Sequence, residues 1–179
     1  MTIDLVLLAL IALLPGSWFF YTLTIQEGSQ VQIYYYNFTV VNVTSASLAF
    51  RLSLSGPGTT QTTITETVPV SNPGLFPLNG SAFGVTNVTY VAKVGNYSVY
   101  EGVFRYNGLT IPVTMYYNQQ GILYNYSGSS NGVKVIAQLQ ASYTPPTQPG
   151  PEPGGLFIVI VVLIALAIGV VTLVKIGKI

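Results

Sequence analysis

The sequence predicts an antiparallel all-β domain of about eight strands, held between two apolar segments of the chain. Between residues 26 and 143, apolar and polar residues alternate with a period of two, which is typical of strands with one buried face. Short turns that contain Gly, Pro or Asn separate these stretches. We therefore expect residues 25–143 to form either a sandwich or a curled half-barrel, because the pattern is compatible with both.

The amino end is apolar. Ten apolar residues at 5–14 are followed by Pro15-Gly16-Ser17, a pattern typical of the hydrophobic region of a secretory signal peptide. The alternative is an uncleaved membrane helix of about residues 3–22, with the aromatic residues 18–21 at the outer interface. Both interpretations assign residues 1–24 to this segment and place the chain that follows outside the membrane.

The first half of the predicted domain contains its clearest strand, Ala46–Leu54, in which every second residue from Leu48 to Leu54 is apolar and large. Gly56-Pro57-Gly58 predicts a turn, and a bend is expected near Asn37. The strands expected in this half are 31–44, 46–54 and 60–70, and residues 71–84 are expected to form a loop.

The second half is predicted to be a run of hairpins. Asn107-Gly108 favours a type I′ turn and Gly95-Asn96 is a second two-residue turn signal. Pro112 has no N–H to donate, so its strand is expected to be an edge strand or bulged at that point. The strands expected here are 85–94, 97–106, 109–117, 122–126 and 133–141.

A stalk and a membrane anchor are predicted after the β domain. Residues 144–155 contain five Pro and three Gly, which favours polyproline II, and fully extended they would span up to roughly 35 Å. Residues 156–174 carry no charge, and a helix of that length spans roughly 28 Å, close to the hydrocarbon thickness of a bilayer. Lys175 and Lys178 follow, so residues 175–179 are expected inside and the β domain outside.

Within this predicted span, Ala165 and Gly169 have a small-xxx-small spacing that would allow close packing of two helices. Apolar filler is the alternative interpretation. The chain is therefore expected in the cell membrane, crossing it once, or twice if the amino-terminal helix is uncleaved.

The composition excludes several classes of chemistry. The chain has no Cys and no His, which excludes disulfides, thiolate and imidazole catalysis and nearly all zinc, copper, haem and iron–sulfur sites. Its few basic residues are scattered, so no nucleic-acid surface is expected. Glu66 and Glu101 are the best candidates for a glycosidase pair, but solvated carboxylates are the ordinary interpretation. We expect no catalytic residues, no metal and no cofactor.

Asn-x-Ser/Thr sequons are frequent for a chain of this length. Asn37 and Asn42 fall inside a predicted strand, so they are expected to be less accessible than Asn79, Asn96 and Asn125, which lie nearer to turns. The six glycosylation candidates are Asn37, Asn42, Asn79, Asn87, Asn96 and Asn125.

Clustered tyrosines are the remaining candidate site. Their rings could form a contact surface for sugars or proteins, although tyrosines on strands more often fill the periphery of a small core. The candidates are Tyr34, Tyr35, Tyr36, Tyr116, Tyr117, Tyr124 and Tyr126.

Taken together, these features resemble the small membrane-anchored, glycosylated surface proteins of thermoacidophilic archaea of the Sulfolobus type. The shared features are a cysteine-free β domain rich in Tyr, Thr and Asn, many sequons, a Pro-rich stalk and a C-terminal anchor followed by lysines. The resemblance covers the whole layout and rests on composition and architecture. Membrane-anchored S-layer subunits are similar in their C-terminal helix, but this chain lacks their long heptad-patterned coiled coil. A surface subunit of an archaeal virus with a membrane would share the same features.

The sequence thus favours a non-enzymatic cell-envelope protein with a structural or adhesive role. The alternatives are an accessory subunit of a respiratory or transport complex, a carbohydrate-binding module, and an archaeal viral envelope protein. The expected partners are the membrane, other envelope or membrane-complex proteins and glycans.

Overall fold

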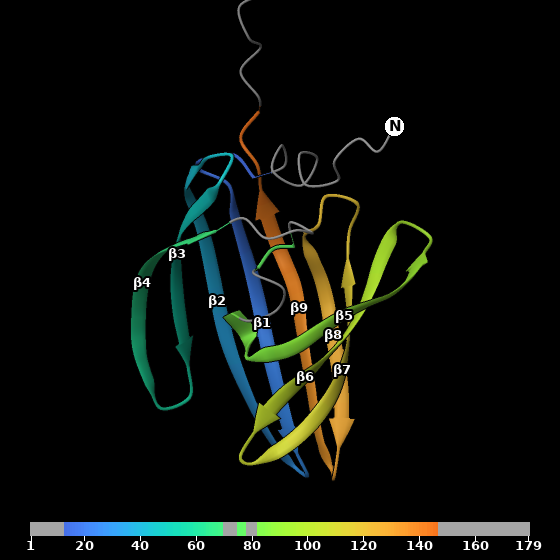
Figure 1. The fold of residues 1–179 in the computed structure, drawn as a ribbon. Helices are drawn as coiled ribbons and strands as arrows, with labels where there is room; N and C mark the ends of the chain where they lie inside the picture. The colour runs from blue at the N-terminus through green and yellow to red at the C-terminus, as the bar shows by residue number, and fades with distance from the viewer. Residues whose placement is uncertain (1–12, 70–74, 78–81, 147–179) are drawn as a thin grey trace, which may run out of the picture. The chain divides into compact units, whose positions relative to one another are not determined.

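A computed structural model describes residues 13–69, 75–77 and 82–146 of the chain. The compact unit Met1–Pro145 contains nine strands, which form one antiparallel sheet in the order β4-β3-β2-β1-β9-β8-β7-β6-β5 (Figure 1). The strands are β1 (Trp18–Glu27), β2 (Gln30–Val43), β3 (Ser47–Gly56), β4 (Thr59–Pro69), β5 (Val85–Val94), β6 (Tyr97–Tyr106), β7 (Leu109–Tyr117), β8 (Leu123–Ser130) and β9 (Val133–Tyr143).

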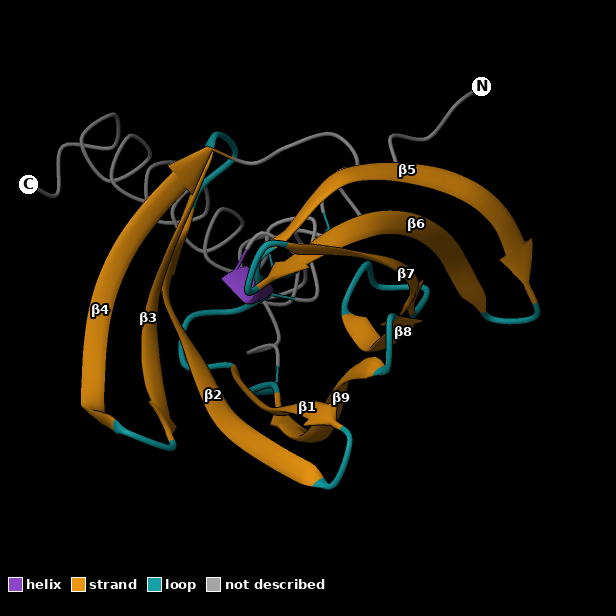
Figure 2. Cartoon of the chain, turned by 90° about the horizontal axis from the view of Figure 1, so that it is seen from below, coloured by secondary structure: helices purple, strands orange, loops and turns teal. Residues whose placement is uncertain are grey.

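The sheet is open and strongly curled (Figure 2). Side chains alternate between its two faces, and the core lies on the inner side of the curl, where β1 contributes every second residue from Phe19 to Ile25. The antiparallel all-β prediction is confirmed. A sandwich needs two sheets packed face to face, whereas the described strands form a single sheet, which leaves the curled form of the two predicted alternatives.

The first strand corrects the predicted start of the β domain. Residues 18–24, which the sequence assigned to a signal peptide or membrane helix, form most of β1, and β1 is hydrogen-bonded between β2 and β9. Phe19, Tyr21 and Leu23 are buried in the core. The error has a physical cause, because a continuous run of apolar and aromatic residues hides the period of two that marks a strand.

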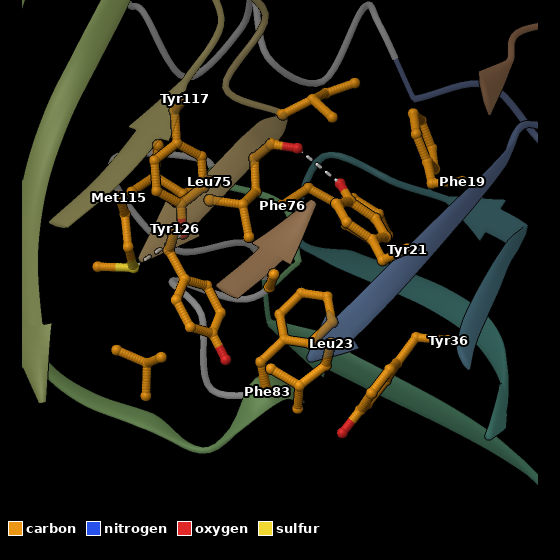
Figure 3. Packing of buried hydrophobic residues seen from close by; sticks show 14 of the residues in the cluster. Phe19, Tyr21, Leu23, Tyr36, Leu75, Phe76, Phe83, Met115, Tyr117 and Tyr126 are labelled. Atoms are coloured by element: carbon orange, nitrogen blue, oxygen red, sulfur yellow. Dashed lines mark hydrogen bonds between the residues drawn. The ribbon is translucent and has the colours of Figure 1, made fainter. Parts of the chain in front are cut away.

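The connection between β4 and β5 contributes to the core, although the sequence predicted only a loop. Phe76 forms a parallel bridge with Ile122, and its N–H donates to the Gly121 carbonyl at 2.8 Å. The Phe76 ring lies 5.1 Å from the Phe19 ring, and the Phe83 ring lies 4.7 Å from the Tyr36 ring. Figure 3 shows Phe76 and Phe83 among the buried side chains of the sheet.

The hairpin turns follow the predicted chemistry. Asn107 and Gly108 have φ values of 46° and 78°, and Asn131 and Gly132 have 49° and 77°. Positive φ at both positions is what a type I′ turn requires, and Asn and Gly tolerate it. The first of these turns is the one predicted.

Two details differ from the sequence prediction. β8 continues to Ser130, beyond residue 126, where the strand was predicted to end. Pro112 lies in β7, an interior strand, but the pairing of β7 with β8 extends only as far as Val113, paired with Gly128. At Pro112 the strand is therefore paired with β6 alone, which accommodates the missing N–H.

No helix long and apolar enough to cross a membrane occurs in the part of the chain that the structure describes. The predicted span at 156–174, including Ala165 and Gly169, lies outside the described residues, as do the tail 175–179, most of the stalk and the apolar residues 5–12.

Candidate functional site

The structure divides the seven candidate tyrosines between the two faces of the sheet. Tyr36, Tyr117 and Tyr126 are buried in the core, and Tyr34 is packed against it. These four belong to the fold and are not a free contact surface. The remaining three candidates are half-buried or exposed on the opposite face: Tyr35, Tyr116 and Tyr124.

The buried hydroxyl groups differ in their hydrogen bonding. The Tyr21 hydroxyl donates to the Leu123 carbonyl at 2.9 Å, whereas the Tyr126 hydroxyl is buried without a partner. Burial, and to a smaller extent the nearby Tyr117, raises the pKa of Tyr21 well above its ordinary value. Burial likewise raises the pKa of Tyr126. These groups stay neutral at physiological pH, so they supply no base or nucleophile.

The two candidate carboxylates do not form a catalytic pair. Glu66 in β4 is opposite Phe50, a core residue, so the two side chains share the inner face of the sheet. Glu101 in β6 lies between the buried Tyr100 and Gly102, so it points to the outer face. A glycosidase needs both carboxyl groups on one cleft, and these side chains lie on opposite faces. No group of three or more metal-ligating side chains occurs among the described residues.

Aromatic side chains gather on the outer face of β1, β2 and β9. The Phe20 and Tyr35 rings stack at 6.0 Å with an interplanar angle of 4°. The Trp18 and Tyr143 rings stack at 6.4 Å and 25°. Trp18, Tyr35 and Tyr143 are 37%, 42% and 48% exposed. We call these four residues the outer aromatic patch.

A shallow hollow of about 400 Å³ adjoins the outer aromatic patch. Its lining comes from three neighbouring strands: Trp18, Phe20, Asn37, Thr39 and Ala141. Phe20 is opposite Asn37 in the β1–β2 pair, and Trp18 is opposite Thr39. The hollow therefore joins an aromatic wall to the Asn and the Thr of one sequon, without a charged side chain in its lining.

Two further hollows also contain a sequon asparagine. One, of about 360 Å³, is lined by Asn87 together with Glu101 and neighbouring residues of β5, β6 and β7. The other, of about 280 Å³, is lined by Asn96 and Tyr97 at the β5–β6 turn and by residues 118–120. Near it the Tyr97 ring lies 5.4 Å from the Tyr124 ring and 6.5 Å from the Tyr116 ring.

The prediction that Asn37 and Asn42 are less accessible than Asn125 is wrong. Asn37 and Asn42 are exposed although they lie in β2, because their side chains face away from the core. Asn125 is half-buried, and its Oδ1 is buried without a hydrogen-bond partner. Among the others, Asn87 and Asn96 are exposed, and Asn79 lies outside the described residues.

Sequence reasoning missed Trp18 and Phe20 as members of a surface. Both were assigned to a membrane or signal segment because they stand in an unbroken aromatic run. The available signal was the alternation that follows them, Tyr21-Thr-Leu-Thr-Ile25, which extends back to place residues 18 and 20 on the outer face.

No protein-family model matches the chain, and no curated protein matches it. Among solved structures, it is similar to MucB of the Pseudomonas aeruginosa MucA/MucB complex at 12% identity, with a TM-score of 0.38. That match covers 83% of this chain and 61% of MucB, so the chain spans about three fifths of the length of that protein.

Two other solved structures are similar over most of their length. LprF from Mycobacterium bovis is 13% identical with a TM-score of 0.34, and the match covers 80% of this chain and 96% of LprF. A DUF1329 family protein from Desulfovibrio piger is 10% identical with a TM-score of 0.34, covering 83% of this chain and 93% of that one. TM-scores of this size leave the function to be argued from the residues of this chain.

Proposed function

We propose that the chain is a non-enzymatic, membrane-anchored envelope protein whose β domain is held outside the membrane for structural or adhesive contact. The observation that carries this proposal is the pairing of β1 with β9. Trp18, the first residue of β1, is opposite Tyr143, the last residue of β9, so the chain enters and leaves the sheet at the same end. The uncharged run 156–174 follows that end after only twelve residues, 144–155.

The opposite end of the sheet, away from the tether, is available for contact with a partner. Tight turns close the hairpins there, at Gly28-Ser29, Pro57-Gly58, Asn107-Gly108 and Asn131-Gly132 (Figure 1). These turns consist of small and uncharged residues. A domain tethered at one end presents such turns, and the outer face of its sheet, to the surroundings.

The chemistry of the domain supports a non-enzymatic role. The sequence contains neither His nor Cys, and Glu66 and Glu101 lie on opposite faces of the sheet. The buried tyrosines are held neutral by raised pKa values. The side chains of the described core are thus used for packing, which matches a protein that acts by contact.

Site-specific proteolysis tests the topology. We would place a tobacco etch virus protease site between Gln148 and Pro149, within the stalk, and in a matched version append the same site after Ile179. Protease added to intact cells or spheroplasts should release the β domain from the first version and leave the second uncut. Cleavage of the second version only would reverse the topology and contradict the proposal. Resistance of both versions in intact cells, with cleavage of both after detergent, would also contradict it.

Purification in a mild detergent separates this proposal from an accessory-subunit role. An envelope protein should fractionate with surface layers or envelope material. Stoichiometric recovery with a cofactor-bearing enzyme complex would instead support the accessory role.

A further inference from the structure

The sequon at Asn37 has a particular position in the sheet. Phe38 is fully buried in the core, so Asn37 and Thr39 on either side of it both point to the outer face. The amide of Asn37 and the hydroxyl of Thr39 make no side-chain hydrogen bond among the described residues. At this site Asn37 is exposed and Thr39 is half-buried, and both groups that define the sequon are unengaged.

The surroundings of Asn37 match the chemistry of a sugar. Phe20 lies directly across the β1–β2 pair from Asn37, and Trp18 lies across from Thr39. Both rings line the hollow of about 400 Å³ that contains Asn37. One face of a pyranose ring consists of C–H bonds, which pack well against the flat face of an aromatic ring, while its hydroxyls remain in water. The hollow has room for a first sugar beside the asparagine.

Two other sequons have engaged polar groups. Asn96 Oδ1 accepts a hydrogen bond from Gln119 Nε2 at 3.1 Å. In the sequon of Asn42, the Thr44 hydroxyl accepts hydrogen bonds from the N–H groups of Ala46 and Ser47 at 3.3 and 2.9 Å. These bonds would have to break before the sequon could enter a transferase site.

The remaining described sequons differ in other ways. Asn125 is half-buried with a buried Oδ1. Asn87 has a positive φ of 55° and lies in a hollow with Glu101, which offers a carboxylate where the Asn37 hollow offers aromatic rings. Asn37 is thus the described sequon that combines exposure, free polar groups and an aromatic wall.

We propose that Asn37 carries an N-linked glycan and that its first sugar lies in the hollow against Phe20 and Trp18. The inference rests on the proposed location outside the membrane. Transfer from a polyprenyl-phosphate-linked oligosaccharide forms a bond between Asn37 Nδ2 and the anomeric carbon of the first sugar. The bond from that carbon to the phosphate oxygen breaks, the lipid phosphate leaves, and Nδ2 gives up one proton.

Peptide mass spectrometry of the full chain from its native membrane tests the modification. The peptide that contains Asn37 should carry a glycan mass, and Asn37→Gln should remove that mass. Asn125→Gln should leave the glycan content of the protein unchanged. Glycans at Asn42, Asn87 or Asn96 together with an unmodified Asn37 would overturn the inference while leaving the proposed location intact. A chain without any glycan would also overturn it, and the protease test would decide the location independently.

The position of the first sugar can be tested separately by fluorescence, because Trp18 is the only tryptophan in the chain. In the full chain, Asn37→Gln should shift the Trp18 emission to longer wavelength, since the ring gains contact with water. The matched change Asn87→Gln should leave the emission unchanged. An unchanged Trp18 emission in Asn37→Gln would contradict the proposed position of the sugar against Trp18. Quenching of Trp18 by brominated phospholipid in vesicles would also contradict it, because the outer aromatic patch would then face lipid.

A double-mutant comparison separates stacking from a general effect of glycosylation. Loss of the glycan through Asn37→Gln should lower the melting temperature by a few degrees in the otherwise unchanged chain. The same change in a Phe20→Thr background should lower the melting temperature by less, because one of the two rings that contact the sugar is already absent. An equal loss in both backgrounds would show that the sugar does not lie on Phe20.

Discussion

At the start of β1, both faces of the strand carry aromatic residues, and the two faces serve different purposes. Phe19 and Tyr21 are 1% and 0% exposed on the inner face, where they meet rings from β2 and from the β4–β5 connection. Trp18 and Phe20 alternate with them on the outer face and stack on Tyr143 and Tyr35. The comparison shows that the face on which an aromatic residue lies, and not its type, decides whether it stabilises the fold or forms a surface.

The contacts on the two faces also differ in kind. On the inner face, Phe38 has neighbouring rings on several sides, including Tyr21 at 5.9 Å, Phe76 at 5.5 Å and Phe83 at 5.8 Å. On the outer face, the Phe20 and Tyr35 rings form a single parallel stack with one side open to solvent. Loss of an inner ring leaves a cavity, whereas loss of an outer ring leaves a place that water fills.

Removal of β1 should have the largest effect on the stability of the domain. A fragment of residues 25–145 lacks the strand that joins β2 to β9, which divides the sheet into three strands on one side and five on the other. We expect it to show no cooperative thermal unfolding, whereas a fragment of residues 13–145 should unfold cooperatively with a β-type circular dichroism spectrum. Cooperative unfolding of the shorter fragment would show that β1 is dispensable.

Alkaline pH should destabilise the domain through the tyrosines of its inner face. Burial raises the pKa of Tyr21, Tyr117 and Tyr126, so the folded state holds protons that the unfolded chain releases. Their contribution to stability is complete below the unfolded pKa of about 10 and is lost as pH rises towards the folded values. Absorbance at 295 nm should therefore show Tyr21, Tyr117 and Tyr126 ionising only as the domain unfolds. A single titration near pH 10 with the fold intact would contradict this.

Two Tyr→Phe changes on the inner face should change the free energy of unfolding by different amounts or in opposite directions. Tyr21→Phe removes the hydrogen bond to the Leu123 carbonyl and should lower the free energy of unfolding by about 1 to 2 kcal/mol. Tyr126→Phe removes a buried hydroxyl without a partner, so the stability should stay within about 1 kcal/mol or rise. Urea denaturation of both variants measures the difference. A larger loss in Tyr126→Phe would mean that its hydroxyl has a partner in solution.

A change on the outer face should have the smallest effect. Tyr35 is 42% exposed and stacks on Phe20, so Tyr35→Ala should lower the free energy of unfolding by no more than about 1 kcal/mol. The same urea titration measures it. A loss of several kcal/mol would show that the outer stack contributes to folding as much as the core does.

The strands from β2 onward were largely predictable from the sequence. Alternation in residues 46–54 and positive-φ residues such as Asn107-Gly108 locate strands and turns by local rules. β1 was not predictable, because Trp18-Phe19-Phe20-Tyr21 is apolar on both faces and shows no alternation of apolar and polar residues. Nor was the role of Phe76 and Phe83, because their burial depends on how the β4–β5 connection crosses the inner face.

The candidate site was predictable only in part. The sequence identified Asn37 as a sequon and Tyr35 as a surface candidate, since both rest on local motifs. Their combination with Phe20 and Trp18 depends on the register between β1 and β2, in which Phe20 is opposite Asn37. A shift of that register by one residue would move Asn37 into the core, so the site requires the pairing that only the fold supplies.

The most direct test compares Phe19→Ala with Phe20→Ala in the same urea experiment. These neighbours are the same residue type in the same strand and differ only in the face they occupy. We predict that Phe19→Ala lowers the free energy of unfolding by about 3 to 5 kcal/mol and Phe20→Ala by no more than about 1 kcal/mol. Equal losses, or a larger loss for Phe20→Ala, would contradict the assignment of one face to the core and the other to the surface.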